Sequence, residues 1–540
     1  MTSRWWPSIL AVIYLLLTVA FTFPLVQSLS DHTPAADHSG DQYQTIWFFW
    51  WMKKALLSLH NPYWTNDIYF PHGTGLAHHL SPATNVFAWL VSLVTTAPIN
   101  SPLVFNLLLL STFAICGLGA YVLIREISGS ELAAFLGSVF ITFSPYRLWN
   151  LNHLNLLSLG WGILAFYFFI RALKTARIQD AVKSVASFTI LFYASLSDAL
   201  FVAVLISVYC LLSWREIMYH SSRSRLLRII GLGIALSGIA MLPGLWQLRV
   251  TGSAWNQNWS DLITYSLDLQ CTVVPPANTT TLSQWIGSAH PWDSGHAPDA
   301  FLGWTLLVMV MATLLTWRTG RIRIRWLVLA FVFLILSMGP GLRIGDNVYA
   351  NGYMPYRFLF ESMPYLNLSR TPIRFSVLTQ LCLVVFASQG LAVWCQSLSR
   401  FWSSKFTRLG TAALASGVVL ILLWIEYRPH RIELWPMDVP GVYRTVAANS
   451  SITAVLDLPA RDAGPAQNRY MYWQTFYDHK SVNGYLTHAS PGATTLLDRI
   501  KTWDEVDRQR ADELKSLGVN AIVIRDPNVL GQEPRLVIIP

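Results

Sequence analysis

The segment SGDQYQTIWFFWWMKK, residues 39–54, places a single carboxylate, Asp41, in front of a run of aromatic residues. Five consecutive aromatic side chains follow it, from Trp47 to Trp51. Tryptophan and tyrosine rings favour the boundary between a membrane and water. We therefore expect a tryptophan-rich helix that ends in Met-Lys-Lys to lie in the interface on the outer side of the membrane rather than to cross the bilayer. Asp41 would then face water at the start of this helix.

The composition of the whole chain is typical of a membrane protein. Of its 540 residues, 53% are hydrophobic and 12% are charged, and the mean hydropathy is +0.41. Several apolar runs reach the roughly 20 residues that a helix needs to cross a bilayer. These runs predict an α-helical polytopic protein with about eleven spans, at about 5–28, 102–124, 131–149, 152–170, 182–198, 199–214, 226–247, 300–317, 325–339, 374–396 and 409–426.

The distribution of charge predicts which side of the membrane each loop faces. Lys and Arg concentrate in cytoplasmic loops, and 17 of the 25 Lys and Arg residues before residue 428 fall on one side of these spans. Eleven acids fall on the other side and four on the basic side. The N-terminus is therefore expected in the cytoplasm, with a long first outer loop over residues 29–101. Basic loops near anionic lipid account for the net charge of +9, so we expect no nucleic-acid partner.

Charge also divides the chain into two parts. Residues 428–540 hold 26 of the 67 charged side chains. This change predicts a membrane domain over residues 1–427 and an extracytoplasmic domain over residues 428–540, a length that can bury its own core. Strand-like and helical patterns alternate in the second part, which indicates a small α/β fold.

Two roles are open for Asp41 from its position alone. Ser39 or Asp41 could cap the following helix, because either side chain can accept from the free backbone N–H groups. Alternatively, an acid at the membrane boundary could take a proton from an acceptor hydroxyl within hydrogen-bond reach. Asp37 and Asp67 lie in the same outer loop and are alternative acids for this task.

The first outer loop resembles that of the GT-C superfamily of integral-membrane glycosyltransferases. The shared features are an acid directly after the first span, an aromatic helix, and the pattern NPY-x(5)-YFPHG-x-x-L-x-x-H from residue 61. Within the superfamily, the chain is most similar to the bacterial protein-mannosyltransferase and aminoarabinose-transferase group. The resemblance implies a fold of about eleven membrane helices with a trailing extracytoplasmic domain.

The same resemblance implies a function. Such enzymes move a sugar from a polyprenyl-phosphate donor to a lipid, protein or glycan acceptor outside the cytoplasm, generally with inversion at the anomeric carbon. By resemblance, Asp41 is the general base and the protein lies in a bacterial inner membrane, with its C-terminal domain on the extracytoplasmic side.

A candidate site for the donor phosphate lies where the tenth span begins, in NLSRTPIRFS, residues 367–376. Arg370 and Arg374 flank this helix start, and a helix N-terminus with two arginines is a good anion site. We expect them to stabilise the phosphate as it leaves. Arg147 in SPYRLWNLNH, residues 144–153, is a third candidate. The alternative role for Arg370 and Arg374 is anchoring at the interface or pairing with Glu361 or Asp346.

Histidines in the first outer loop could also take part. His78 and His79 could bind the phosphate, bind a metal or pair with Asp41, or could simply contact a loop carbonyl. Further acids and histidines nearby make a divalent cation conceivable, namely Asp31, His32, Asp37 and His38. Their spacing fits no standard zinc pattern, so we assign no metal site and no cofactor. Asp198, at a predicted outer hairpin, is a further candidate acid; its place at the turn also suits a solvated acid or a helix cap.

Two other functions fit a polytopic chain. A transporter or flippase of a lipid-linked or polar substrate predicts repeated halves, broken helices and several ionisable residues in mid-membrane. A non-catalytic scaffold for envelope assembly predicts that Asp41 can be replaced without consequence. The chain has no evident internal repeat and its acids cluster in outer loops, so we favour the transferase.

Overall fold

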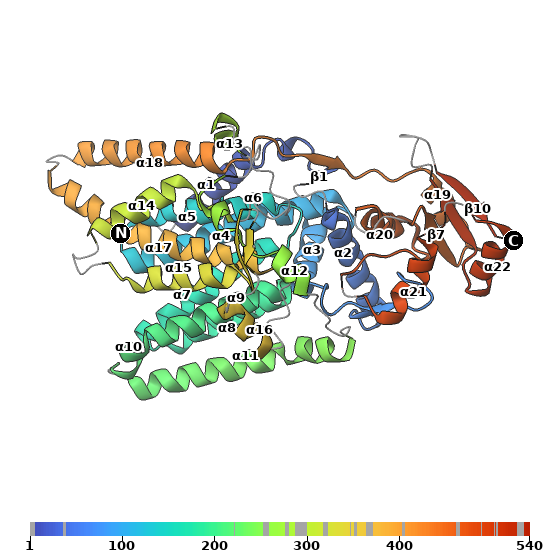
Figure 1. The fold of residues 1–540 in the computed structure, drawn as a ribbon, viewed down its shortest axis with the longest axis horizontal. Helices are drawn as coiled ribbons and strands as arrows, with labels where there is room; N and C mark the ends of the chain where they lie inside the picture. Colours follow the sequence, from blue (N-terminus) through green and yellow to red (C-terminus); the bar gives the residue numbers. More distant parts are fainter. Residues whose placement is uncertain are drawn as a thin grey trace.

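The structure is a computed structural model. It describes residues 6–35, 39–220, 222–251, 259–275, 280–286, 300–316, 322–345, 347–349, 354–362, 371–401, 405–460, 465–487, 489–501, 503, 506–525 and 534–539. Figure 1 shows an elongated molecule, with a bundle of long helices at one end and a C-terminal part containing strands at the other.

Helices occupy all of the predicted spans. In chain order they are α1 (Trp6–Phe21), α4 (Pro102–Ser128), α5 (Glu131–Thr142), α7 (Leu159–Thr175), α8 (Ile178–Ala194), α9 (Leu196–Leu212), α11 (Arg223–Thr251), α14 (Trp304–Thr316), α15 (Arg325–Ser337), α17 (Ser376–Phe401) and α18 (Lys405–Tyr427). Within the described residues, four segments are long and apolar enough to cross a membrane: Pro102–Ser128, Leu156–Thr175, Arg223–Val250 and Pro372–Ser397. The number of membrane crossings therefore stays a prediction.

The predicted boundaries of the third and fourth spans are wrong. Helix α5 ends at Thr142, a short helix α6 (Pro145–Trp149) follows, and α7 begins only at Leu159. Pro145 has no backbone N–H and its ring clashes with the preceding helical turn, so α5 cannot continue through it. The chain from Asn150 to Ser158 forms a turn instead, with a single 3-10 turn, η2 (Leu156–Ser158), before α7.

Helix α4 lies at the centre of the bundle and packs against α1, α5 and α7. Gly160 allows the close approach of α7, because a Cβ atom at this position would lie 2.8 Å from the backbone nitrogen of Cys116. Small residues permit such close packing between membrane helices, where dispersion contacts drive association.

The first outer loop folds into two helices and a small hairpin. Helix α2 (Asp41–Leu57) is followed by strands β2 (Trp64–Thr65) and β3 (Thr74–Gly75), which pair antiparallel, and by helix α3 (Pro82–Thr95). Earlier in the loop, strand β1 (His32–Pro34) pairs antiparallel with β6 (Leu434–Pro436). The first outer loop is therefore joined to the segment that follows α18.

The C-terminal part contains a four-stranded sheet in the order β10-β9-β7-β8. Strand β7 pairs parallel with both β8 and β9, and β10 pairs antiparallel with β9. Its elements are α19 (Val442–Ala448), β7 (Ala454–Leu458), α20 (Pro465–Tyr477), β8 (Lys480–Ser481), α21 (Pro491–Ile500), α22 (Arg508–Ser516), β9 (Ala521–Ile524) and β10 (Arg535–Ile538). Whether residues 428–540 form a domain of their own stays a prediction.

Helix α2 does not present its aromatic rings to a membrane interface, contrary to the prediction. Trp47 is fully buried, its ring stacks on that of Trp51 at 5.9 Å, and its Nε1 donates to Oε1 of Gln474 at 2.7 Å. Gln474 belongs to α20, so the aromatic helix packs against the C-terminal part. Figure 1 shows α2, α3 and α20 between the bundle and the C-terminal sheet. One apolar core joins residues of the first loop, such as Trp47, to strand residues such as Leu456.

Candidate functional site

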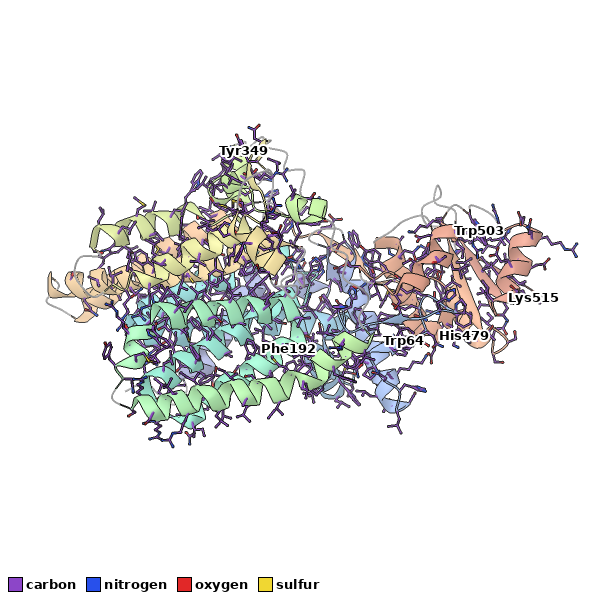
Figure 2. The ribbon with its side chains drawn as sticks, turned by 60° about the horizontal axis from the view of Figure 1, so that its bottom comes forward. Trp64, Phe192, Tyr349, His479, Trp503 and Lys515 are labelled. Atoms are coloured by element: carbon purple, nitrogen blue, oxygen red, sulfur yellow. The ribbon has the colours of Figure 1, made fainter. Side chains whose placement is uncertain are left out.

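A cavity of about 500 Å³ lies where the first outer loop meets the outer ends of the bundle helices. This volume is within the range of roughly 300–1,000 Å³ that is usual for small-molecule sites. Its walls include Asp41, His78, His79, His153, Asn155, Phe192, Tyr193, Tyr265, Thr371, Arg374 and Tyr485. Figure 2 shows Phe192 in the helical part, while Trp64 and His479 lie nearer the C-terminal part.

Asp41 is the first residue of α2 and lies on the cavity wall. The preceding Gly40 is the N-cap residue and has a φ of +75°, a left-handed conformation that glycine adopts without steric cost. Gly40 has no side chain that could cap the helix. The hydroxyl of Ser39 accepts from the Asp41 N–H at 3.3 Å. Asp41 is therefore not the cap, and its carboxylate lies at the positive end of the helix dipole.

Two distant segments hold the Asp41 carboxylate. Its Oδ2 lies 3.0 Å from Nδ1 of His153, and its Oδ1 accepts from Nδ2 of Asn468 at 3.4 Å. Asn468 belongs to α20 and also donates to the Ser39 carbonyl at 3.2 Å. The carboxylate remains 31% exposed, whereas the histidine is 10% exposed. Asp41 is thus fixed in place but still reaches the cavity.

Sequence reasoning missed His153, although this residue stands in the quoted segment SPYRLWNLNH. It lies in the turn between α6 and α7, where its N–H donates to the Asn150 carbonyl at 3.0 Å. The neighbouring Asn152 donates from Nδ2 to the Ser39 hydroxyl at 2.9 Å. A run of asparagine and histidine between two apolar helices was the available signal, since such residues suit a polar turn at a site.

Arg374 lines the same cavity and belongs to the helical bundle. It lies in the single turn η7 (Pro372–Phe375) that precedes α17, as the sequence predicted for this helix start. Its Nε is buried and has no hydrogen-bond partner among the described residues. A buried guanidinium nitrogen in this state is suited to an anionic ligand. Arg370 lies outside the described residues.

Asp198 is buried in the first turn of α9, with 1% of its surface exposed. Its backbone N–H donates to the Ser195 hydroxyl at 3.3 Å. The positive charges of Arg374 and Arg147 act on this carboxylate. Asp198 is therefore a buried acid and not a solvated acid of an outer hairpin.

The structure corrects the prediction that Arg147 binds the donor phosphate. This side chain is fully buried and does not line the cavity. Its guanidinium donates to the carbonyls of Thr142 and Leu157 at 3.1 and 2.9 Å, and lies over the Phe113 ring. Arg147 instead ties the end of α5 to the turn that carries His153.

Asp67 is likewise not at the cavity. Its Oδ2 pairs with Nζ of Lys54 at 2.7 Å, and Lys54 also contacts Asp478 of the C-terminal part. These two carboxylates raise the pKa of Lys54 above its ordinary value against the opposing effect of burial. Asp67 thus has a structural partner, whereas Asp37 lies outside the described residues.

His78 and His79 both line the cavity, in the segment between β3 and α3. Both rings are half-buried, and the His79 N–H donates to the Leu76 carbonyl at 2.9 Å. Across the residues that the structure describes, no group of three or more His, Cys, Asp or Glu side chains could hold a metal ion. His38, one of the residues considered for a cation, lies outside that part of the chain.

Comparison with known proteins identifies the fold. A family model described as "Domain of unknown function (DUF6311)" matches residues 10–400. No curated protein sequence matches the chain. The apo oligosaccharyltransferase of Archaeoglobus fulgidus is a similar solved structure, with a TM-score of 0.57 and 11% identity over 96% of this chain and 70% of that chain.

A mycobacterial arabinofuranosyltransferase, AftD, is also similar, with a TM-score of 0.57 and 15% identity over 97% of this chain. The match spans 37% of the length of that larger protein. At these identities the likeness concerns the fold, and both neighbours are GT-C glycosyltransferases. The predicted resemblance to the GT-C superfamily is therefore confirmed at the level of the fold.

Proposed function

The chain belongs to the DUF6311 family, and we propose that it is a membrane glycosyltransferase that uses a polyprenyl-phosphate sugar. The observation that carries the proposal is the position of Asp41, a carboxylate held by His153 and Asn468 on the wall of a cavity that Arg374 also lines. The similarity to two sugar transferases is consistent with this function.

Asp41 is proposed to act as the general base. The acceptor hydroxyl gives its proton to the Asp41 carboxylate while its oxygen attacks the anomeric carbon of the donor sugar. The bond between that carbon and the phosphate oxygen breaks as the new glycosidic bond forms, so the anomeric centre inverts. A base within hydrogen-bond reach of the hydroxyl typically contributes a factor of roughly 10² to 10⁴ to the rate.

Arg374 is proposed to bind the phosphate of the donor. Its buried Nε has no hydrogen-bond partner among the described residues and can donate to a phosphate oxygen. Negative charge accumulates on this oxygen as the polyprenyl phosphate leaves, so a fixed guanidinium stabilises the transition state more than the ground state. Arg370, two residues before the turn η7 in the sequence and outside the described residues, remains a second candidate for the same phosphate.

The charged side chains of the bundle support the proposed orientation in the membrane. Arg323 and Arg325 both pair with Glu216 of α10 (Trp214–Met218). Figure 1 shows α10 at the end of the bundle far from the C-terminal part. Basic residues at that end favour the cytoplasmic side, which would put the cavity and the C-terminal part outside the cytoplasm, in a bacterial inner membrane.

The proposal is tested with the purified full-length protein in lipid nanodiscs and a panel of radiolabelled polyprenyl-phosphate sugars. We expect transfer from one donor to an added glycan or lipid acceptor, and an inverted anomeric configuration in the product by NMR. No transfer from any donor would refute the proposal and favour a transporter or a scaffold. A retained configuration would refute a single displacement with Asp41 as base.

A further inference from the structure

A second cavity of about 200 Å³ adjoins the first. It lies between α3, α4 and α7, and it shares the wall residues Thr84, Leu154 and Ala194 with the larger cavity. The two cavities are therefore neighbours that share part of their walls. We refer to the smaller one, lined by residues of α3, α4 and α7, as the side groove.

The walls of the side groove are apolar. Phe87 of α3 and Trp161 of α7 stack their rings at a distance of 5.8 Å, and aliphatic residues of α3 and α4 complete the lining. The hydroxyls of Ser111 and Ser158 donate to carbonyls of their own segments, Leu108 at 2.7 Å and Leu154 at 3.1 Å. None of the described lining residues carries a charge. The groove therefore suits an apolar ligand and not a phosphate.

The side groove also reaches the outer face of α3. This helix exposes an apolar stripe at helical spacing, with exposed fractions of 44% for Val86, 52% for Leu90, 65% for Leu93 and 84% for Val94. Leu90 belongs to both the stripe and the groove wall. An exposed apolar helix face on a membrane protein is expected to contact lipid. A chain that enters the groove past Leu90 can thus come directly from the bilayer.

The groove wall includes a direct neighbour of the residue that holds the base. Leu154 lines both cavities and follows His153, the partner of Asp41, whereas Arg374 does not line the groove. In a displacement with inversion, the acceptor and the leaving phosphate lie on opposite faces of the sugar. An apolar chain in the groove therefore belongs to the molecule whose hydroxyl meets Asp41.

We propose that the side groove binds the apolar chain of a lipid-anchored acceptor, so that the enzyme glycosylates a membrane lipid or a lipid-linked glycan. This inference rests on the proposed function, since it uses the acceptor side of the reaction. The lipid chain holds the acceptor hydroxyl at Asp41, and the donor phosphate remains at Arg374.

The test uses photocrosslinking and needs no turnover. The full-length protein in nanodiscs is irradiated with an alkyl glucoside that carries a diazirine at its chain end, and separately with a diazirine-bearing polyprenyl phosphate. Labelled peptides are located by mass spectrometry. We expect the alkyl glucoside to label the groove segments of α3, α4 and α7, and an excess of unlabelled alkyl glucoside, but not free glucose, to abolish the labelling.

A pair of variants links the label to the groove. Ser111→Trp fills the groove and should reduce labelling by the alkyl glucoside at least tenfold. Leu93→Trp, on the exposed stripe outside the groove wall, should leave it unchanged. Ser158→Phe fills the groove from a different chain segment, η2, and replaces Ser111→Trp if the melting temperature shows that Ser111→Trp does not fold.

The possible results separate this inference from the proposed function. Three labelling results would overturn the inference: labelling of the groove by the polyprenyl phosphate alone, by both probes equally, or by neither probe. Labelling that persists in both groove-filling variants would also overturn it. Sugar transfer without groove labelling would support the proposed transferase function and refute the proposed lipid site. Saturable groove labelling without any transfer would support the lipid site and refute the transferase function.

Discussion

Nδ1 of His153 lies 3.0 Å from Oδ2 of Asp41, so a turn between two bundle helices holds the acid that begins the first outer helix. The turn is itself held by the buried Arg147, which donates to the Leu157 carbonyl. In this arrangement the orientation of the base depends on the bundle as well as on the outer loop.

Replacement of His153 should lower turnover by misplacing the Asp41 carboxylate. We expect His153→Ala to reduce kcat by roughly 100-fold, because a displacement of about 1 Å at a reacting group can cost that much. His153→Asn keeps a donor near Nδ1 and should recover much of the loss. Steady-state kinetics check this, with the KM for the donor expected to change little. Equal losses in the two variants would contradict a positioning role.

Replacement of Arg374 should affect the donor phosphate. Arg374→Gln removes the charge, and we expect kcat to fall by roughly 10² to 10³, the typical cost of removing one donor to a developing oxyanion. Arg374→Lys keeps a point charge without the planar fork and should be intermediate. Unchanged kcat and donor KM in Arg374→Gln would show that the phosphate is bound elsewhere.

Asp67 should matter for stability and not for chemistry. Asp67→Asn removes the partly buried ion pair with Lys54, and we expect a loss of about 1–3 kcal/mol in the free energy of unfolding. Turnover of the folded variant should stay within about twofold of the wild type. Thermal unfolding and transfer assays on the same preparation check both points. A large loss of turnover at full stability would make Asp67 the base.

Trp47 should be among the most important residues for joining the first loop to the C-terminal part. Trp47→Ala removes a fully buried ring and leaves Oε1 of Gln474 without its donor. Such truncations typically cost about 3–5 kcal/mol. The exposed Trp64 provides the control, because surface substitutions usually stay within about 0.5 kcal/mol. Similar melting temperatures for Trp47→Ala and Trp64→Ala would contradict the packing described for α2.

The stability of the C-terminal part should depend on pH through Asp457. Burial raises the pKa of this carboxyl to about 7, although the Tyr443 hydroxyl donates to it. The unfolded chain has the ordinary value of about 4, so the folded form binds more protons between these values. Stability should therefore fall as the pH rises from 4 to 7 and then level off.

Asp457→Asn keeps an acceptor for Tyr443 and cannot ionise, so it should flatten this pH dependence. Melting temperatures of the full-length protein at pH 5 and pH 8 measure the effect. An equal decrease in both proteins over this range would assign the pH dependence to other groups.

The positions of the bundle helices could be predicted because an apolar run is a local signal. The end of α5 could also have been predicted, since Pro145 is present in the sequence. The predicted span nevertheless followed the apolar run through this proline. The parallel pairing of β7 with β8 and β9 could not be derived from the strand patterns, because pairing depends on contacts between distant segments.

The site was predictable in part. Asp41 and Arg374 came from their positions at helix starts next to predicted spans, and both line the cavity. The partners of Asp41, His153 and Asn468, lie far away in the chain, and no local pattern joins them to it. The prediction for Trp47 was wrong for the same reason, because α20 supplies a protein partner where the sequence indicated only a membrane interface.

The most direct test of the account compares sugar transfer by the wild type, Asp41→Asn and Asp31→Asn in the same nanodiscs. Asp31 is an exposed acid of the same outer loop that does not line the cavity, so it is the matched control. We predict that Asp41→Asn folds and loses at least 100-fold in kcat, within the range expected for a general base, while Asp31→Asn retains wild-type activity. Transfer by Asp41→Asn at the wild-type rate would contradict the assignment of Asp41 as the base.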